Sequence, residues 1–460
     1  MSALTEPTFA GRSPTHAGDL SVETHGIAPI AEDRRYGSPA RLFTVWFAPQ
    51  VNMTGIFTGA LAIVLGLGFW LGLLAMVIGT VLGSLVVAYL STWGPRTGTG
   101  QVPNSRMAFG DGVALPAALQ WLGSIAWDAL VGLFGGEALA VLLGIPFWSA
   151  VLIVMGVQAA AGFFGYEVIH RMQAVLTVVL FTTFVVFAVK LVGGHEIAIA
   201  PVVHGADLAG AFVLEVTIAF SIAVSWASYA ADFSRYLPAD SSRGRVFGYT
   251  FAGLASAYIF VEGIGIAAAD LVSEHTAQGV HEVMGGGFLG GLALLVIALA
   301  SIGSGVMNDY SGSLALQTMG VRVRRPVSAV IVAVPAFALI MWLHAADTAT
   351  RFQDVLLLVS YWIPGFVSIV VIDWLLRIRG RASINPADEP TDRRDAVAAV
   401  IVFLIAYAVS IPVMYTTLLQ GAVAKAWHGA DIAYFVNLLV AAVLYGGYRL
   451  LRSRASSSAG

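Results

Sequence analysis

The chain contains no cysteine, and only 11% of its 460 residues are charged. The absence of cysteine excludes disulfide bonds, thiolate metal sites and cysteine nucleophiles. The shortage of charge says more, because soluble domains carry about a quarter charged residues. With 58% hydrophobic residues and a mean hydropathy of +0.82, a water-soluble fold would lack the polar side chains needed to cover its surface. The composition therefore indicates an integral membrane protein.

A concentrated basic region is also lacking. The net charge is −3, and the arginines are dispersed between apolar segments, which excludes a nucleic-acid-binding face. Residues 1–40 contain much Ser, Thr, Pro and Gly and no long apolar run, so we expect them to form a disordered cytoplasmic tail. The folded part is expected to begin near Arg41.

Long apolar segments fill the rest of the chain. A helix that crosses the hydrocarbon core needs about twenty residues, because each residue rises 1.5 Å and all backbone polar groups must be satisfied within the segment. Twelve segments meet this requirement. They are Leu42–Leu67, Phe69–Trp93, Leu115–Leu143, Phe147–Gly165, Val168–Val192, Leu208–Ala231, Val246–Ala269, Gly287–Met319, Val327–His344, Val355–Ile378, Ala396–Leu418 and Ile432–Leu451.

The cationic residues predict the orientation of these segments. Short cytoplasmic loops of membrane proteins collect Lys and Arg. If the N-terminus is cytoplasmic, all but three of the 24 cationic residues fall on the cytoplasmic side, the exceptions being Lys190, Arg351 and Lys425. One missed span in mid-chain would destroy this asymmetry. We therefore predict a multi-pass protein of the cell membrane with twelve transmembrane helices and both termini in the cytoplasm.

Polar residues interrupt the first span. Pro49, Gln50 and Asn52 lie in otherwise apolar sequence, and Pro49 removes one intrahelical hydrogen bond. Broken transmembrane helices expose backbone groups around a solute cavity, so this segment is a candidate binding region. A packed proline kink is the alternative interpretation.

The sixth span contains a second polar stretch. Ser221, Ser225 and Ser228 share one helical face, with Trp226 beside them. Such a face is too polar to point at lipid. It predicts either a solute site or close packing between helices, since small hydroxyl residues serve both purposes.

The third and eighth spans hold amide and carboxyl groups at membrane depth. Asn308 and Asp309 lie in the eighth span, and Trp127 and Asp128 lie near the middle of the third. Polar and ionisable groups inside a membrane are costly and often mark a solute or ion path. Alternatively, Asp309 reaches cytoplasmic water and Trp127 only fills the core.

In several separate motifs, the chain resembles the nucleobase-cation-symport-1 family of purine, cytosine and allantoin permeases. The resemblance covers residues 36–452. Its most specific parts are GPRTG at 94–98, SRMAFG at 105–110, SW at 225–226, DFSRYLP at 232–238, and NDYS at 308–311 with Gln317.

The resemblance implies the leucine-transporter-like fold, in which two inverted repeats of five helices precede two peripheral helices. The repeats would occupy residues 41–207 and 208–380. The peripheral spans would lie in 381–454, followed by a short cytoplasmic tail at 455–460. In such folds the first and sixth helices are unwound at the midplane, where the polar interruptions of this sequence lie.

Family members hold a flat ring between an aromatic residue of the third helix and a tryptophan of the sixth. An asparagine of the eighth helix contacts the ring's edge. By resemblance these roles fall on Trp127, Trp226 and Asn308. A carboxamide is chemically suited to this role, because it offers a donor and an acceptor side by side. The other candidate substrate-binding residues in the interrupted segments are Gln50, Asn52 and Ser225.

The coupling cation is predicted to be Na⁺ or H⁺, and no other cofactor is implied. In sodium-coupled members, carbonyls of the first helix and hydroxyls of the eighth bind the ion, and the candidates here are Ala48, Val51, Ser301 and Ser304. With Asn308 in register, however, the family's hydroxyl positions fall on Ile302 and Gly303. Buried carboxyl groups are the alternative proton carriers. The carrier candidates are Asp128, Glu137 and Asp309, and Asp232 with Arg235 is a candidate gate.

The sequence thus predicts a symporter that imports a planar nucleobase, cytosine or a purine first, by alternating access. Another heteroaromatic solute, such as allantoin, hydantoin, uracil or a vitamin ring, is the nearest alternative. An enzyme is disfavoured because no histidine lies deep in any span to form a catalytic group. A channel is disfavoured because no ring of charge or pore motif is visible. The expected partners are the base, a monovalent cation and the lipid bilayer, and a monomer is compatible with this function.

Overall fold

The computed structural model describes residues 26–162, 166–194, 196–272, 276–321, 325–380, 384 and 391–457. Over these residues the chain is all-helical, with one isolated β-bridge between Tyr415 and Gln420 and no strand. A chain this apolar must satisfy its backbone polar groups internally, and a helix does so within a single segment. The all-helical class predicted from the sequence is confirmed.

The long helices follow the predicted spans. They are α1 (Arg41–Phe47) with α2 (Met53–Val64), α3 (Gly68–Ser91), α7 (Ala114–Leu143), α8 (Phe147–Gly162), α9 (Tyr166–Gly194), α10 (Gly205–Val224), α11 (Arg243–Ala267), α14 (Gly287–Thr318), α15 (Arg325–Ala345), α16 (Thr348–Leu358) with α17 (Ile363–Gly380), α18 (Arg393–Ser410) and α20 (Ala433–Ser457).

Short helices occupy the connections and the breaks. Those in connections are α4 (Gly94–Thr97), α5 (Gln101–Asn104), α6 (Arg106–Phe109), α12 (Ala269–Val272), α13 (Thr276–Val283) and α19 (Ala422–Ala426). The 3₁₀ turns are η1 (Glu32–Arg34), η2 (Ala48–Gln50), η3 (Gly110–Val113), η4 (Ser225–Tyr229) and η5 (Ile411–Val413).

The predicted spans coincide with helices, although not all of these are long. Among the described residues, nine helices are long and apolar enough to cross a membrane, or ten if the bent pair Arg41–Gln50 and Met53–Val64 is one span. The other two predicted spans coincide with the shorter apolar helices Phe147–Ala161 and Ile331–Ala345. The positions of the twelve predicted segments therefore match, while the length criterion is met by nine or ten.

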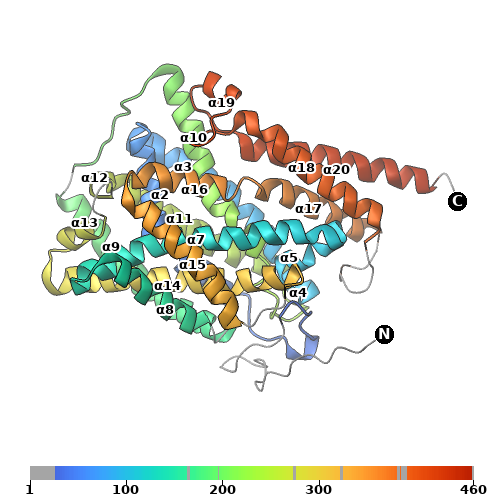
Figure 1. Cartoon of the computed structure of the whole chain (residues 1–460), viewed down its shortest axis with the longest axis horizontal. Coiled ribbons are helices and arrows are strands. Elements are labelled where there is room, and N and C mark those ends of the chain that lie inside the picture. The colour runs from blue at the N-terminus through green and yellow to red at the C-terminus, as the bar shows by residue number, and fades with distance from the viewer. Residues whose placement is uncertain are drawn as a thin grey trace.

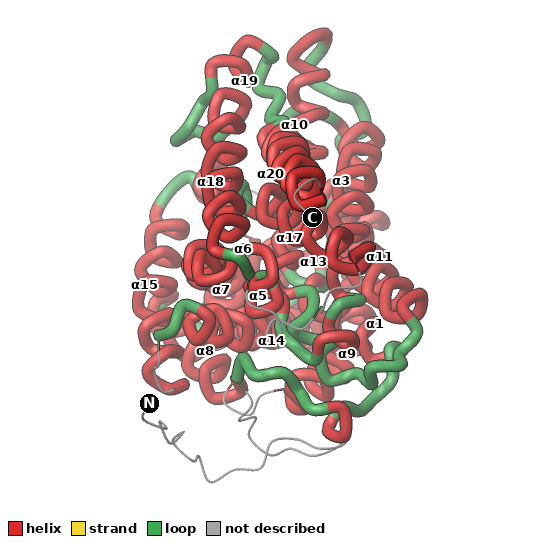
Figure 2. The backbone as a smooth tube through the Cα atoms, turned by 90° about the vertical axis from the view of Figure 1, so that its right-hand side faces the viewer, coloured by secondary structure: helices red, strands yellow, loops and turns green. Residues whose placement is uncertain are grey.

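The helices form two groups that pack mainly within themselves. One group contains α7, α8, α14 and α15, and the other contains α2, α3, α10 and α11. Figure 2 shows α7, α8 and α15 on one side and α1, α3 and α11 on the other, with α14 between them. Helices α17, α18 and α20 pack together as a further layer. A site between the first two groups would lie in the middle of the molecule.

The connections are sorted between the two ends of the bundle. In Figure 1, α12 and α13 lie at the left-hand end, whereas α4, α5 and the C-terminal end of α20 lie toward the right. The predicted topology places α12 and α13 outside and the other three segments inside. The arrangement is consistent with that topology.

The first and sixth spans are both interrupted, as predicted. In the first, α1 ends at Phe47, the 3₁₀ turn η2 follows, and α2 leaves at 58° to the axis of the preceding segment. In the sixth, α10 ends at Val224 and passes into η4. Pro49 explains the first break, because its ring nitrogen cannot donate to the preceding turn.

The tenth span is also broken, which the sequence interpretation missed. The predicted continuous helix Val355–Ile378 is divided into α16 and α17, with a turn at residues 359–362. Pro364 lies in the first turn of α17, where its missing N–H costs no helical hydrogen bond. Pro364 therefore favours the start of a new helix, α17, over the continuation of α16.

The prediction of a disordered tail is wrong for residues 26–40, the part of that tail that the structure describes. Ile30 and Tyr36 are buried with Tyr236 in a small apolar cluster. The Ile30 amide donates to the Gly98 carbonyl (2.9 Å), and Arg35 donates to the Pro95 carbonyl (2.6 Å). This segment is thus attached to the connection after the second span. At the other end, α20 continues to Ser457, into the second predicted tail.

Candidate functional site

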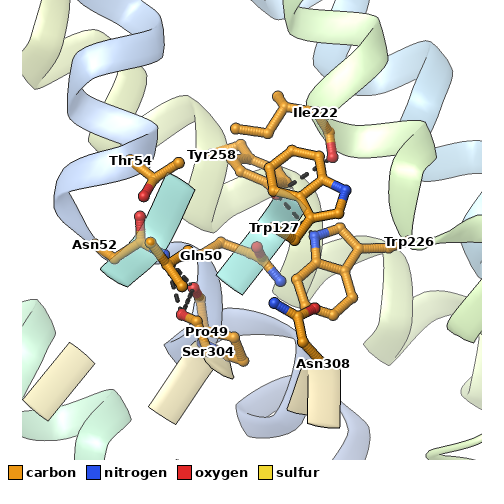
Figure 3. A pocket seen from close by; sticks show the side chains of 11 residues that line it. Pro49, Gln50, Asn52, Thr54, Trp127, Ile222, Trp226, Tyr258, Ser304 and Asn308 are labelled. Atoms are coloured by element: carbon orange, nitrogen blue, oxygen red, sulfur yellow. Dashed lines mark hydrogen bonds between the residues drawn. The ribbon is translucent and has the colours of Figure 1, made fainter. Parts of the chain in front are cut away.

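A cavity lies where the interrupted first span faces α7, α11, α14 and the end of α10 (Figure 3). It contains about 280 Å³ of space between atoms. Two indole rings and several amide and hydroxyl groups line it, a combination that suits a ligand with flat faces and a polar edge. The lining residues are Pro49, Gln50, Asn52, Thr54, Trp127, Val131, Ile222, Trp226, Tyr258, Ser304 and Asn308.

Asn52 organises the break in the first span. Its backbone is extended and its Oδ1 accepts from the Gly55 amide (3.0 Å), which makes it the N-cap of α2. Its Nδ2 donates to the Pro49 carbonyl (2.5 Å) and to the Ser304 hydroxyl (3.1 Å). The side chain that lines the cavity is therefore held by contacts on both sides of the break.

Gln50 offers the cavity a free donor. The side chain is buried, and its Nε2 has no hydrogen-bond partner among the described residues. Figure 3 shows the amide extending into the pocket between Asn52 and the two tryptophans. Because a buried N–H without a partner costs about 1–3 kcal/mol, a ligand acceptor at this position would be stabilised.

The two tryptophans reach the cavity from different helix groups. Trp127 comes from the middle of α7 and Trp226 from the start of η4, and each is only 7% exposed. The Trp226 Nε1 donates to the Tyr258 hydroxyl (2.9 Å), and its ring meets Trp46 edge-on at 5.7 Å. These contacts fix the plane of the Trp226 indole before any ligand enters.

Asn308 lies at the edge of the cavity and is oriented from behind. Its Nδ2 donates to Asp128 Oδ1 (3.2 Å), and both side chains are 3% exposed. An amide held through one N–H keeps its carbonyl oxygen and second N–H for another partner. Asn308 can therefore present an acceptor and a donor to the edge of a ring.

The structure brings together five of the six predicted substrate-binding residues, namely Gln50, Asn52, Trp127, Trp226 and Asn308. Ser225 is not among the lining residues of this cavity, and its role in substrate binding stays a prediction. The Ser225 hydroxyl donates to the Ile222 carbonyl of its own helix (2.7 Å).

The sequence interpretation missed Tyr258, Thr54, Ile222 and Val131 in the lining. Tyr258 is the most consequential, since it holds the indole of Trp226. It lies in α11, four residues before the carboxyl side chain of Glu262, and nothing local in the sequence connects it with the sixth span. The one signal in the sequence that could have pointed to Tyr258 was a hydroxyl group in an otherwise apolar helix.

The predicted cation ligands are only partly brought together. The Ser304 hydroxyl faces the break and donates to the Pro49 carbonyl (2.6 Å), whereas the Ser301 hydroxyl donates to the Val131 carbonyl of α7 (2.7 Å). Of the two alternatives for the hydroxyl ligand, Ser304 contacts the break of the first span and Ser301 contacts α7. The Ala48 carbonyl accepts from the Val51 amide (3.1 Å). Protein donors thus already satisfy several of the oxygens that a cation would need.

The predicted carriers Asp128 and Asp309 and the predicted gate residues are not in the lining of this cavity and lie in two other places. Asp128 and Asp309 line a second cavity with Gln158, and Gln158 Nε2 donates to Asp309 Oδ2 (3.0 Å). Asp232 accepts from the Gln101 amide (2.7 Å). Arg235 donates to the Tyr310 hydroxyl (2.8 Å) and to the Gly26 carbonyl. Asp232 and Arg235 thus connect the end of the sixth span to the segments around it.

Residues 29–437 match a protein family described as permeases for cytosine/purines, uracil, thiamine and allantoin. The chain is 25% identical over 457 residues to the putative purine-cytosine permease YxlA of Bacillus subtilis, an alignment that covers 96% of this chain and 98% of the relative. It is 25% identical to the purine-cytosine permease fcyB of Emericella nidulans, over 93% of this chain and 88% of the relative.

A more distant relative carries a different cargo in its name. The vitamin B6 transporter TPN1 of Saccharomyces cerevisiae is 24% identical over 66% of this chain and 56% of the relative. The similarity therefore extends to transporters of other small heteroaromatic compounds.

Solved structures show the same fold. Mhp1, a nucleobase-cation-symport-1 family transporter in a closed conformation with bromovinylhydantoin bound, superposes with a TM-score of 0.75 at 19% identity, covering 95% of this chain and 97% of Mhp1. The inward-facing conformation of Mhp1 gives a TM-score of 0.73, also at 19% identity. The leucine-transporter-like fold implied by the sequence resemblance is confirmed.

Proposed function

Because this chain belongs to the nucleobase-cation-symport-1 family of permeases, we propose that it imports a planar nucleobase, cytosine or a purine first, together with a monovalent cation. The family and the relatives are membrane transporters, so the chain is a nucleobase-type permease and not an enzyme. The finer proposal concerns the cargo, the cation and the transport cycle.

One observation carries the choice of cargo. Trp127 and Trp226 line a single cavity, with the amide of Asn308 at its edge. Indole rings bind flat π systems by stacked or edge contacts, and a carboxamide pairs with the donor–acceptor edge of a base. The free donor of Gln50 adds a second polar contact in the same cavity. A nucleobase has both features in one small molecule.

The position of the cavity supports alternating access. Tyr258 belongs to the group of α2, α3, α10 and α11, and Trp226 lies in η4, which directly follows α10. Trp127 and Asn308 belong to the group of α7, α8, α14 and α15. A solute held between two separately packed groups is released to either side when one group rocks against the other. We propose this motion as the transport step.

Sodium fits the break of the first span poorly. A sodium site there needs oxygen lone pairs directed at one point. The Pro49 carbonyl and the Ser304 hydroxyl instead accept from Asn52, and the family's other hydroxyl positions hold Ile302 and Gly303. The donor set therefore favours a proton as the coupled cation.

The positively charged residues support the location. With the N-terminus inside, 21 of the 24 Lys and Arg residues fall on the cytoplasmic side of the spans. We propose that the protein lies in the cell membrane with both termini in the cytoplasm.

Uptake of radiolabelled compounds into proteoliposomes tests the function. We expect uptake of tritiated cytosine or of a purine above that of protein-free liposomes, with competition by unlabelled base. Protein without uptake of cytosine, adenine, hypoxanthine, uracil, allantoin or hydantoin would contradict the proposal.

A different heteroaromatic cargo is the second candidate. It is favoured by the vitamin B6 transporter and the hydantoin-bound Mhp1 among the similar proteins. Competition of cytosine uptake by pyridoxine and by hydantoin separates the two candidates, because the true cargo should compete at the lowest concentration.

A further inference from the structure

A second cavity lies directly behind the base pocket. It contains about 210 Å³ of space between atoms and is lined by Asp128, Met155, Gln158, Ala159, Asp309 and Ala333, from α7, α8, α14 and α15. Asp128 is shared with the base pocket through its hydrogen bond to Asn308. A hydrogen bond between one lining residue of each cavity therefore links the two.

The lining of the second cavity contains two carboxyl groups and no positively charged side chain. Asp128 and Asp309 lie close enough to interact across it. Among the described residues, no Lys, Arg or His pairs with either carboxyl group, and the hydrogen-bond partners that they have are the amides of Asn308 and Gln158. Tyr229 of η4 interacts electrostatically with both of these carboxyl groups and with Asp232.

Two carboxylates cannot both remain ionised in such a place. Neither carboxyl group has a cationic partner among the described residues, Asp128 is 3% exposed, and two like charges that interact in a buried site repel one another. A single shared proton removes the repulsion, because the protonated carboxyl group donates a hydrogen bond to the other one. The pair then keeps one negative charge, which the amides of Asn308 and Gln158 stabilise.

The shared proton also affects the base pocket. A carboxylate can only accept a hydrogen bond, so Asp128 accepts from an N–H of the Asn308 amide. The amide oxygen of Asn308 is then left to contact the ring. With one proton in the pair, Asp309 holds Asp128 in this position. Without that proton, the two carboxylates repel one another and the contact to Asn308 is disturbed. Protonation and base binding therefore favour the same arrangement of Asn308.

We propose that Asp128 and Asp309 form a proton-binding site, and that its single proton is coupled to base binding through Asn308. The proposal rests on the proposed function, since it assigns the coupled ion of that same transporter. By linkage, the proton raises the affinity for the base as much as the base raises the affinity for the proton. Asp309 acts as a positioning residue and does not touch the base.

A second pair of buried carboxyl groups provides the matched control. Glu215 of α10 and Glu262 of α11 are fully buried, and Thr80 donates to Glu262 (3.0 Å). Glu215 has no hydrogen-bond partner among the described residues. This pair lies within the other helix group and lines neither cavity. Glu215→Gln therefore removes a buried carboxyl group without touching the proposed coupling site.

The experiment uses purified full-length protein in liposomes that contain a pH-sensitive dye. Tritiated cytosine, or the best base of the uptake panel, is added outside, and internal acidification is recorded beside base counterflow. We expect the wild-type protein and Glu215→Gln to acidify the interior when base is added. We expect Asp309→Asn to lose this acidification and to retain measurable counterflow, because its amide imitates the protonated carboxyl group.

Binding measured across a pH series provides the second readout. The base affinity of the wild-type protein should fall at high pH by about tenfold or more, as expected for a coupling free energy of about 1–3 kcal/mol. In Asp309→Asn it should vary less than about twofold over the same series. If Asp309 only supported the position of its neighbours, Asp309→Asn would lower base affinity by the same factor at every pH.

Three results would overturn the inference. The first is base-driven acidification by Asp309→Asn at the wild-type level, and the second is a wild-type pH dependence of base affinity in that variant. The third is loss of base-driven acidification in Glu215→Gln while Asp309→Asn retains it. A wild-type protein without base counterflow would contradict the proposed function itself and remove this inference with it.

Discussion

The two walls of the base pocket are built differently. The wall from the interrupted first span uses Pro49 and Asn52, whose polar groups are largely satisfied by one another and by Ser304 of α14. The wall from the continuous helices α7 and α14 uses Trp127 and Asn308, and Asn308 is hydrogen-bonded to Asp128 of the second cavity. The difference suggests that the break supplies the shape of the pocket, whereas the continuous helices supply the groups that change charge.

Removing an indole should have the largest effect. Trp226→Ala is expected to weaken base binding by about 2–3 kcal/mol, or roughly 30- to 150-fold, because each base–aromatic stack contributes this order of free energy. Scintillation-proximity binding of tritiated base measures the change. Trp70→Ala is the control, since Trp70 is 64% exposed on α3 and outside the pocket. Equal effects of the two substitutions would show that the pocket is elsewhere.

Truncating the amide on the continuous wall should have the next largest effect. Asn308→Ala is expected to weaken base binding by about 1–2 kcal/mol, or roughly 5- to 30-fold, because the polar edge of the ring loses its partner. Competition by a series of bases measures it. Ring analogues that lack the corresponding edge groups should bind both proteins equally. A uniform loss for every analogue would instead indicate that Asn308 only supports the fold.

A smaller effect is expected where one residue positions another. Tyr258→Phe removes the hydroxyl that accepts from Trp226 Nε1, and we expect a loss of about 0.5–1.5 kcal/mol, or roughly 2- to 10-fold, in base affinity. Equilibrium binding measures this loss, and thermal unfolding shows that the fold is retained. Unchanged affinity would mean that the ring contacts of Trp226 with Trp46 and Tyr229 are sufficient to hold the indole.

The smallest effect should come from sodium. At constant pH and ionic strength, replacing Na⁺ by choline is expected to change base affinity by less than about twofold, since Asn52 already occupies the oxygens at the break. The same binding assay checks this. If Na⁺ raised base affinity tenfold or more, the coupled ion would instead be assigned to the break in the first span.

The positions of the breaks could be predicted from the sequence because their causes are local. Pro49 and the polar residues after it mark the first break, and the serine-rich stretch marks the sixth. Pro364 was an equally local signal for the break in the tenth span, but the apolar run around it was interpreted as one helix. The ring-binding residues depended on the family resemblance, which aligns distant segments that periodicity cannot relate.

Which hydroxyl groups reach the cavity could not be predicted from the sequence, for physical reasons. Ser225 was placed on a face by the periodicity of an α-helix, but the chain changes to a 3₁₀ turn at that residue and rotates the following side chains. Ser301 and Ser304 lie three residues apart on one helix, and only the packing decides that one faces α7 and the other the break. Tyr258 acts through a contact between helices, which a single sequence does not reveal.

The N-terminal segment shows that amino-acid composition alone does not decide whether a short segment is ordered. Residues 26–40 are polar enough to suggest disorder, yet Ile30 and Tyr36 are buried against Tyr236. Two buried side chains and a few backbone hydrogen bonds are sufficient to order a short segment on an existing surface. Their effect depends on that surface, and therefore on the fold.

The central claim is that a flat heterocycle binds between Trp127 and Trp226 with its edge at Asn308. Anomalous diffraction from crystals of the protein with a brominated form of its tightest-binding base tests this directly. The account predicts a bromine peak inside the cavity lined by these three residues. A bromine peak elsewhere, under conditions in which binding of the base is measured, would contradict it.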